Sequence, residues 1–103
     1  DIQRKAFVLA NKTGGVSGPA IHPIAVRMVY EAANAVNVPI IGMGGIATAE
    51  DAIEMLLVGA SAVSVGTANF YNPAVTMEIV DGIEQYMEAQ GFASVADMVG
   101  IVK

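Results

Sequence analysis

Residues 40–45 read Ile-Ile-Gly-Met-Gly-Gly, and residues 62–67 read Ala-Val-Ser-Val-Gly-Thr. Each segment is a continuous apolar run that ends in a turn of small residues. Runs of this kind are typical of strands that are covered on both faces of a parallel sheet. We therefore predict two buried parallel strands, over 40–43 and 62–65.

The segment between the two runs has the pattern of a helix. Thr48 and Asp51 form a capping-box pair at its start, and Gly59 is placed to end it. The apolar positions at helical spacing are Ala52, Ile53, Leu56 and Leu57. A strand-helix-strand unit of this length makes a right-handed crossover, which brings the carboxyl ends of both strands to one edge of the sheet.

Further helices flank this unit on both sides. A helix over 23–37 is predicted from apolar residues at every fourth position, with Pro23 in its first turn; these residues are Ile24, Met28, Ala32 and Val36, with Ala25, Val29 and Ala33 beside them. Asn72-Pro73 starts a third helix that ends at Gly91, with an inward face made of Val75, Ile79, Ile83 and Tyr86.

The two ends of the chain carry weaker signals. The run 6–10 suits a short strand, 11–19 is a glycine-rich loop, and Ser94 starts a short last helix. The alternation of strands and helices predicts an α/β fold, with residues 1–103 in one domain and no separate second domain.

Composition narrows the classes of partner. The 103 residues include 5 basic and 10 acidic side chains, a formal net charge of −5, which disfavours nucleic acid and anionic membranes and favours a small molecule. No run approaches the roughly 20 apolar residues of a membrane span, and 1–5 does not resemble a signal peptide. The absence of Cys fits a reducing cytoplasm.

The hydrophobic fraction of 54% is high for so short a chain, because small domains leave much of their surface in water. We expect faces of this chain to be buried against more protein, including another copy in a homo-oligomer. Both sheet edges are expected to be unpaired, so the 103 residues alone should not form a stable monomer.

The Gly44-Gly45 and Gly66-Thr67 turns are the candidate binding site. Glycines let the main chain approach an anion, the following helix offers amides at its N-terminus, and the Thr67 hydroxyl can donate one more hydrogen bond. The Gly44-Gly45 turn alone is equally consistent with an ordinary strand-to-helix connection. The pair together predicts a phosphate site, as in the last two loops of many (β/α)8 barrels.

Three strings carry a family resemblance: 9–21 (LANKTGGVSGPAI), 40–46 (IIGMGGI) and 59–68 (GASAVSVGTA). Together they resemble the C-terminal third of dihydroorotate dehydrogenase, in its NAD-linked, two-subunit form. The resemblance implies the C-terminal portion of a (β/α)8 TIM barrel. It also implies a flavoenzyme of pyrimidine biosynthesis that oxidises dihydroorotate to orotate with FMN. Electrons would pass to NAD through a partner subunit that carries FAD and an iron-sulfur cluster.

The same resemblance implies that Gly18, Gly44, Gly45, Gly66 and Thr67 hold FMN through its phosphate and ribityl chain. The family's cysteine base, its lysine near the flavin and its orotate-binding asparagines belong to earlier strands. We therefore assign no catalytic residue and no metal site to this chain, and expect the 103 residues alone to be inactive. A bulky residue at position 45 is expected to lower FMN affinity far more than stability.

Two other functions are compatible with the residues. One is a non-redox barrel that binds a sugar phosphate through the same two turns, as in histidine and tryptophan biosynthesis. The other is an inert fragment that only self-associates. A yellow colour of the intact protein would distinguish the flavoenzyme from the non-redox barrel, and size measurement with flavin titration of the 103 residues would test for the inert fragment.

The remaining polar residues are interpreted as structural or solvated. His22 has no carboxylate or nucleophile beside it in the sequence, so a structural or solvent-facing role is favoured over catalysis. Lys12 is interpreted as exposed rather than as a flavin contact. Solvated helix faces account for Glu50, Asp51, Glu54, Glu78, Asp81, Glu84 and Glu88. The methionines fill the core, although Met28, Met55 and Met77 on outer helices are candidates for facing a partner.

Overall fold

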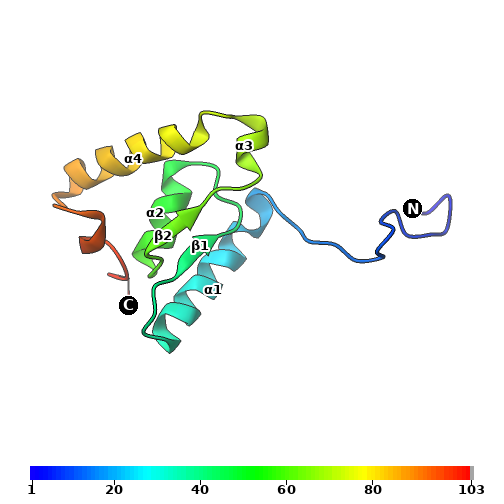
Figure 1. The fold of residues 1–103 in the computed structure, drawn as a ribbon, viewed down its shortest axis with the longest axis horizontal. Coiled ribbons are helices and arrows are strands. Elements are labelled where there is room, and N and C mark those ends of the chain that lie inside the picture. The colour runs from blue at the N-terminus through cyan, green and yellow to red at the C-terminus, as the bar shows by residue number, and fades with distance from the viewer. Residues whose placement is uncertain (103) are drawn as a thin grey trace.

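The computed structural model describes residues 1–102, whose helices and strands alternate along the chain (Figure 1). In order these are η1 (Pro19–Ile21), α1 (His22–Ala35), β1 (Ile41–Met43), α2 (Ala49–Leu57), β2 (Ala62–Ser64), α3 (Ala68–Tyr71), α4 (Val75–Gln90) and η2 (Val95–Asp97). Residues 1–17 run away from the body as an arm.

The centre of the fold is the β1-α2-β2 unit. The two strands pair in parallel, with Gly42 opposite Val63, and form a two-stranded sheet among the described residues. The predicted α/β class, the parallel pairing and the unpaired sheet edges are confirmed. Because the strands are parallel, the turns that follow them lie at the same edge of the sheet.

The N-terminus of α2 is fixed by the predicted capping box. The Thr48 hydroxyl accepts from the Asp51 amide at 3.3 Å, and Asp51 Oδ2 accepts from the Thr48 amide at 3.0 Å and the Ala47 amide at 2.9 Å. At the other end, Gly59 follows the helix with φ 122°, and a Cβ there would lie 2.5 Å from the Ala33 Cβ. Gly59 thus permits close approach of α1 to α2.

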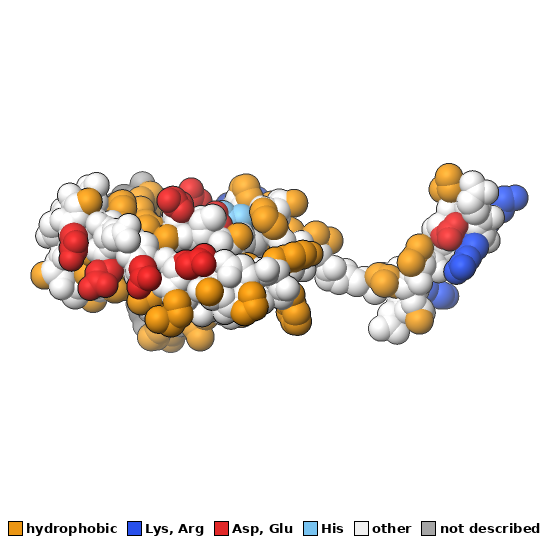
Figure 2. Space-filling model, turned by 90° about the horizontal axis from the view of Figure 1, so that it is seen from above, with side chains coloured by type: hydrophobic (Ala, Val, Ile, Leu, Met, Phe, Trp, Pro, Cys, Tyr) orange, Lys and Arg blue, Asp and Glu red, His pale blue; other side chains and the backbone are white. Residues whose placement is uncertain are grey.

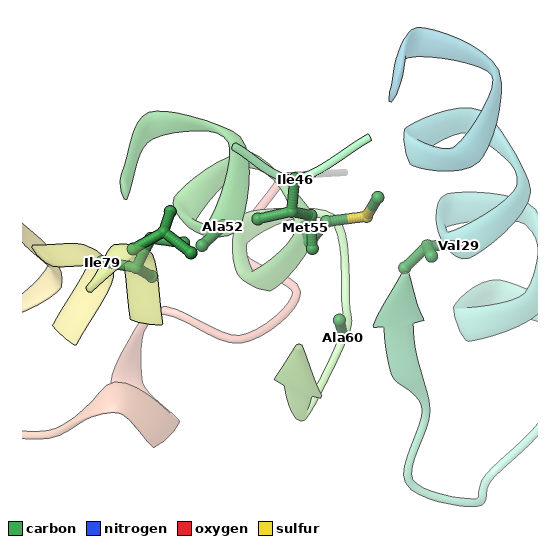
Figure 3. Packing of buried hydrophobic residues seen from close by; sticks show 7 residues of the cluster. Val29, Ile46, Ala52, Met55, Ala60 and Ile79 are labelled. Carbon is green, nitrogen blue, oxygen red and sulfur yellow. The ribbon is translucent and has the colours of Figure 1, made fainter. Parts of the chain in front are cut away.

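Met55 occupies the centre of the main core. Its side chain is fully buried and extends from α2 toward Val29 of α1, with Ile46 beside it (Figure 3). On the other side, Ala52 and Ile79 join α2 to α4. The expectation that Met55 faces a partner was wrong, because α2 is covered by α1 on one side and by α4 on the other.

A second cluster attaches the C-terminal residues to the body. Ile53 and Leu56 of α2 bury Met98, which is itself fully buried. Tyr86 of α4 and Phe92 stack with ring centroids 6.3 Å apart. Gly91 ends α4 in the left-handed conformation at φ 77°, as its position predicts. The short last helix is the single 3-10 turn η2.

The sheet is covered on one face only within the described chain. Gly42 is buried, whereas its neighbours Ile41 and Met43 are 62% and 61% exposed. The chain itself therefore covers these strands on one face only, which agrees with the expectation that faces of this chain are buried against more protein. The physical reason is that the contacts of both strands are with α1 and α2, which leave the opposite face open.

The packed face of α1 is one of the two apolar stripes of this helix. Val29 is buried and Ala25 packs against the core, while Ile24 and Met28 are 62% and 63% exposed. Apolar residues occur on two adjacent stripes of this helix. Spacing alone does not decide which stripe meets the sheet.

Two local predictions failed. Residues 6–10 form bends and turns rather than a strand, because they lie on the arm with no neighbouring strand to pair with. Helix α3 was not predicted. Helix α4 begins at Val75 rather than at Asn72-Pro73, and Asn72 Oδ1 accepts a hydrogen bond from the Ala74 amide at 3.1 Å just before it. The predicted inward residues Val75 and Ile79 are buried.

The predicted solvated acidic face is clearest on α4. Figure 2 shows a row of acidic side chains along this helix, and its acidic residues are exposed: Glu78, Asp81, Glu84 and Glu88. Among the helices of residues 1–102, none is both long enough and apolar enough to cross a membrane.

Replacing Met55 with Ala should lower the free energy of unfolding of the protein by about 2–5 kcal/mol, because it leaves a cavity at the centre of the core. The matched control is Met77→Ala on α4, where the side chain is 63% exposed and the expected loss is below about 1 kcal/mol. Urea unfolding would measure both, and equal losses would contradict the packing described here.

Candidate functional site

A cavity of about 520 Å³ lies where both strands end. Its wall consists of the loop before α1, the turn after β1, and the segment from the end of β2 to the start of α4. The five residues predicted for the site all line it: Gly18, Gly44, Gly45, Gly66 and Thr67. The expected convergence of the two turns on one cavity is thus confirmed.

Gly44 and Gly45 are required where the turn packs against α1. Both have positive φ, 126° and 68°. A Cβ on Gly44 would lie 2.6 Å from the Ala25 Cβ, and one on Gly45 would lie 2.7 Å from the Gly18 carbonyl oxygen and 2.9 Å from His22. The expected reason for Gly45 was therefore wrong: a side chain there would collide with the protein before it obstructed a ligand.

Gly66 is in the opposite situation. A Cβ built on it meets nothing within 4 Å, and its backbone does not lie in the left-handed region. Gly18 also has open space around its Cβ position, but its φ of 98° restricts substitution. Gly66 is thus the glycine at which a side chain can enter the cavity without straining the fold.

Several hydrogen-bond donors at the cavity are free. Within residues 1–102, the amides of Gly45, Gly66 and Thr67 donate to no other group, and the Thr67 hydroxyl does not cap α3. Main-chain amides that converge on one space form a neutral cradle for an anion.

The N-terminus of α2 contributes less than predicted. No residue of α2 lines the cavity, and the amides of Ala47 and Thr48, just before this helix, donate to Asp51 Oδ2. The free donors come from the two turns.

His22 joins the cavity wall to α2. Its side chain is 8% exposed, Nδ1 donates to the Gly44 carbonyl at 2.9 Å, and Nε2 lies 3.2 Å from Glu54 Oε2 and 3.7 Å from Asp51 Oδ1. The structural role expected for His22 agrees with this burial. The expectation that no carboxylate lies nearby was wrong, because Asp51 and Glu54 share a face of α2 that packs beside α1.

Other residues of the wall were missed or misjudged. Ser17, Ser64, Tyr71 and Asn72 line the cavity, and Tyr71 belongs to α3, which was not predicted. Lys12 is exposed on the arm and does not line it.

Two parallel strands, each followed by a helix, with a cavity and free main-chain donors at their carboxyl ends, define an α/β protein of the kind found in barrels. The family model for dihydroorotate dehydrogenase matches residues 1–87, and this chain belongs to that family.

Curated relatives agree with the family match. The chain is 58% identical over 103 residues to "Dihydroorotate dehydrogenase B (NAD(+)), catalytic subunit" of Lachnoclostridium phytofermentans, and 50% identical to the protein of the same name from Bacteroides fragilis. Each alignment covers 100% of this chain and 34% of the relative. The chain therefore spans about a third of the length of these relatives.

A solved structure shows the same fold. Ligand-free DHODH from Eimeria tenella superimposes with a TM-score of 0.82 at 32% identity, covering 98% of this chain and 30% of that one. The predicted fold, part of a TIM barrel, is confirmed by this likeness.

Gly45→Ala should destabilise the protein by about 1–3 kcal/mol, since it combines positive φ with three contacts shorter than 3.0 Å. Gly66→Ala should change stability by less than about 1 kcal/mol because its Cβ meets open space. Thermal unfolding of the two variants tests this difference. A stable Gly45 variant beside an unstable Gly66 variant would contradict the geometry of the turns.

Proposed function

We propose that the protein to which this chain belongs oxidises dihydroorotate to orotate with FMN, and that this segment supplies the site for the FMN phosphate and ribityl chain. The observation that carries the proposal is the set of free donors on one cavity wall: the amides of Gly45, Gly66 and Thr67 and the Thr67 hydroxyl. Gly18 and Gly44 complete the main-chain surface around them.

The cavity suits this cofactor in size and chemistry. Its volume of about 520 Å³ is within the range of small-molecule sites. The residues that line it include no Asp or Glu, so no carboxylate of the described chain opposes a phosphate at the wall. Val16, Ile21 and Met43 add apolar surface. Bound FMN would accept the hydride, while these residues orient it and limit its contact with water.

The catalytic base is outside this chain, which contains no Cys. The names of the relatives in Lachnoclostridium phytofermentans and Bacteroides fragilis, "B (NAD(+)), catalytic subunit", support an electron-transfer partner. We propose that this partner carries FAD and an iron-sulfur cluster and passes electrons to NAD, in the cytoplasm. The open sheet face at Ile41 and Met43 supports burial against further protein, either the rest of this polypeptide or another copy.

Replacing Thr67 with Val removes one donor without changing the shape of the side chain. FMN should bind the full-length apoprotein roughly 10-fold more weakly, the effect of losing one hydrogen bond to a charged group worth about 1.5 kcal/mol. Quenching of flavin fluorescence would measure the dissociation constant.

The matched control is Thr76→Val on the exposed surface of α4, which should leave FMN affinity unchanged. Riboflavin, which lacks the phosphate, provides a second comparison, and Thr67→Val should scarcely affect its binding. An intact protein that is colourless and has no affinity for FMN would overturn the proposed function and favour a non-redox phosphate site.

A further inference from the structure

The Gly44-Gly45 peptide needs a restraint from outside the turn. Two successive glycines have no Cβ to oppose rotation of the peptide plane between them. In a trans peptide the carbonyl and the amide point in opposite directions, so the direction of the Gly44 oxygen also sets that of the Gly45 N–H. A rotated plane would turn a carbonyl oxygen toward an anion that the amide is expected to bind.

His22 supplies such a restraint. Its Nδ1 donates to the Gly44 carbonyl at 2.9 Å from a side chain that is 8% exposed. The Gly45 amide therefore points away from His22, and it has no other partner within residues 1–102. Gly45 lines the cavity, so its amide is a free donor at the wall.

The imidazole is held in turn from α2. Nε2 lies 3.2 Å from Glu54 Oε2 and 3.7 Å from Asp51 Oδ1, while Asp51 Oδ2 accepts from the Ala47 amide. The ring is thus fixed between the turn and the capped N-terminus of α2. Backbone packing supports the same placement, because the space for a Cβ on Gly45 is filled by His22 and the Gly18 carbonyl.

The second turn has a comparable restraint. Asn69 Nδ2 donates to the Gly66 carbonyl at 3.2 Å and to the Val65 carbonyl at 2.7 Å. The Thr67 amide, which shares its peptide with the Gly66 carbonyl, is the free donor there. The Asn69 main-chain amide also donates to the Gly66 carbonyl, at 3.1 Å, so in both turns a glycine carbonyl is held and the next amide is left unpaired.

We propose that His22 is a positioning residue for anion binding: it fixes the Gly44-Gly45 peptide so that the Gly45 amide faces the phosphate. The proposal rests on the function proposed above and adds a residue outside the five assigned to the site. His22 is not among the residues that line the cavity, so it would act only through the peptide that it holds.

Three substitutions in the full-length protein test this role. His22→Ala removes the donor, His22→Gln places an amide nearer the Nε2 position, and His22→Asn places one near the Nδ1 position. We expect FMN to bind about tenfold more weakly to His22→Ala and His22→Gln, and His22→Asn to recover most of the affinity. Riboflavin titrations of each apoprotein are run in parallel.

The phosphate dependence separates positioning from general structural support. We expect riboflavin affinity to change less than twofold in all three variants. Equal weakening of FMN and riboflavin, or an Asn variant no better than the Gln variant, would overturn the positioning role. If His22→Ala binds FMN normally while the wild type prefers FMN to riboflavin, this inference fails and the proposed function stands. A wild type without that preference would overturn both.

Discussion

Parallel pairing of β1 with β2 is the constraint on which the site depends. The register that places Gly42 opposite Val63 also places the Gly44-Gly45 and Gly66-Thr67 turns at one edge of the sheet. Helix α2 makes this register possible, since it spans the crossover and buries Met55 and Ala52 against the neighbouring helices. The cavity is therefore a consequence of strand order, because residues far apart in sequence become neighbours once the two strands align.

Much of this arrangement was predictable because local rules and packing agree in it. The capping box at Thr48, the left-handed stop at Gly91 and the two apolar runs each act within a few residues, so their sequence signals are direct. The failures occur where a distant partner decides the outcome. Residues 6–10 have the composition of a strand but no neighbour to pair with, and the stripe of α1 that packs is chosen by the sheet.

The candidate site likewise combines features that local sequence predicts with features that depend on distant contacts. Its glycines were identified from the turns, but the reasons for them differ: Gly45 is required by the closeness of Gly18 and His22, whereas Gly66 has open space. That difference depends on how α1 lies against β1, which no local pattern encodes. The contact between His22 and Glu54 was missed for the same reason, since the two residues lie on different helices and are 32 positions apart in the sequence.

The anion site proposed above lies in a chain of net charge −5, so the acidic groups have to be kept away from the ligand. Two of these acidic groups, Asp51 and Glu54, instead interact with protein groups close to them. Asp51 accepts from the amides of Ala47 and Thr48, and Glu54 lies against the His22 ring on the side away from the Gly44 carbonyl. The acidic row of α4 lies on its solvent-exposed surface (Figure 2). The residues that line the cavity then present neutral donors, whose direction matters more than total charge. Such a site depends on peptide orientation, and hence on the side chains that fix it.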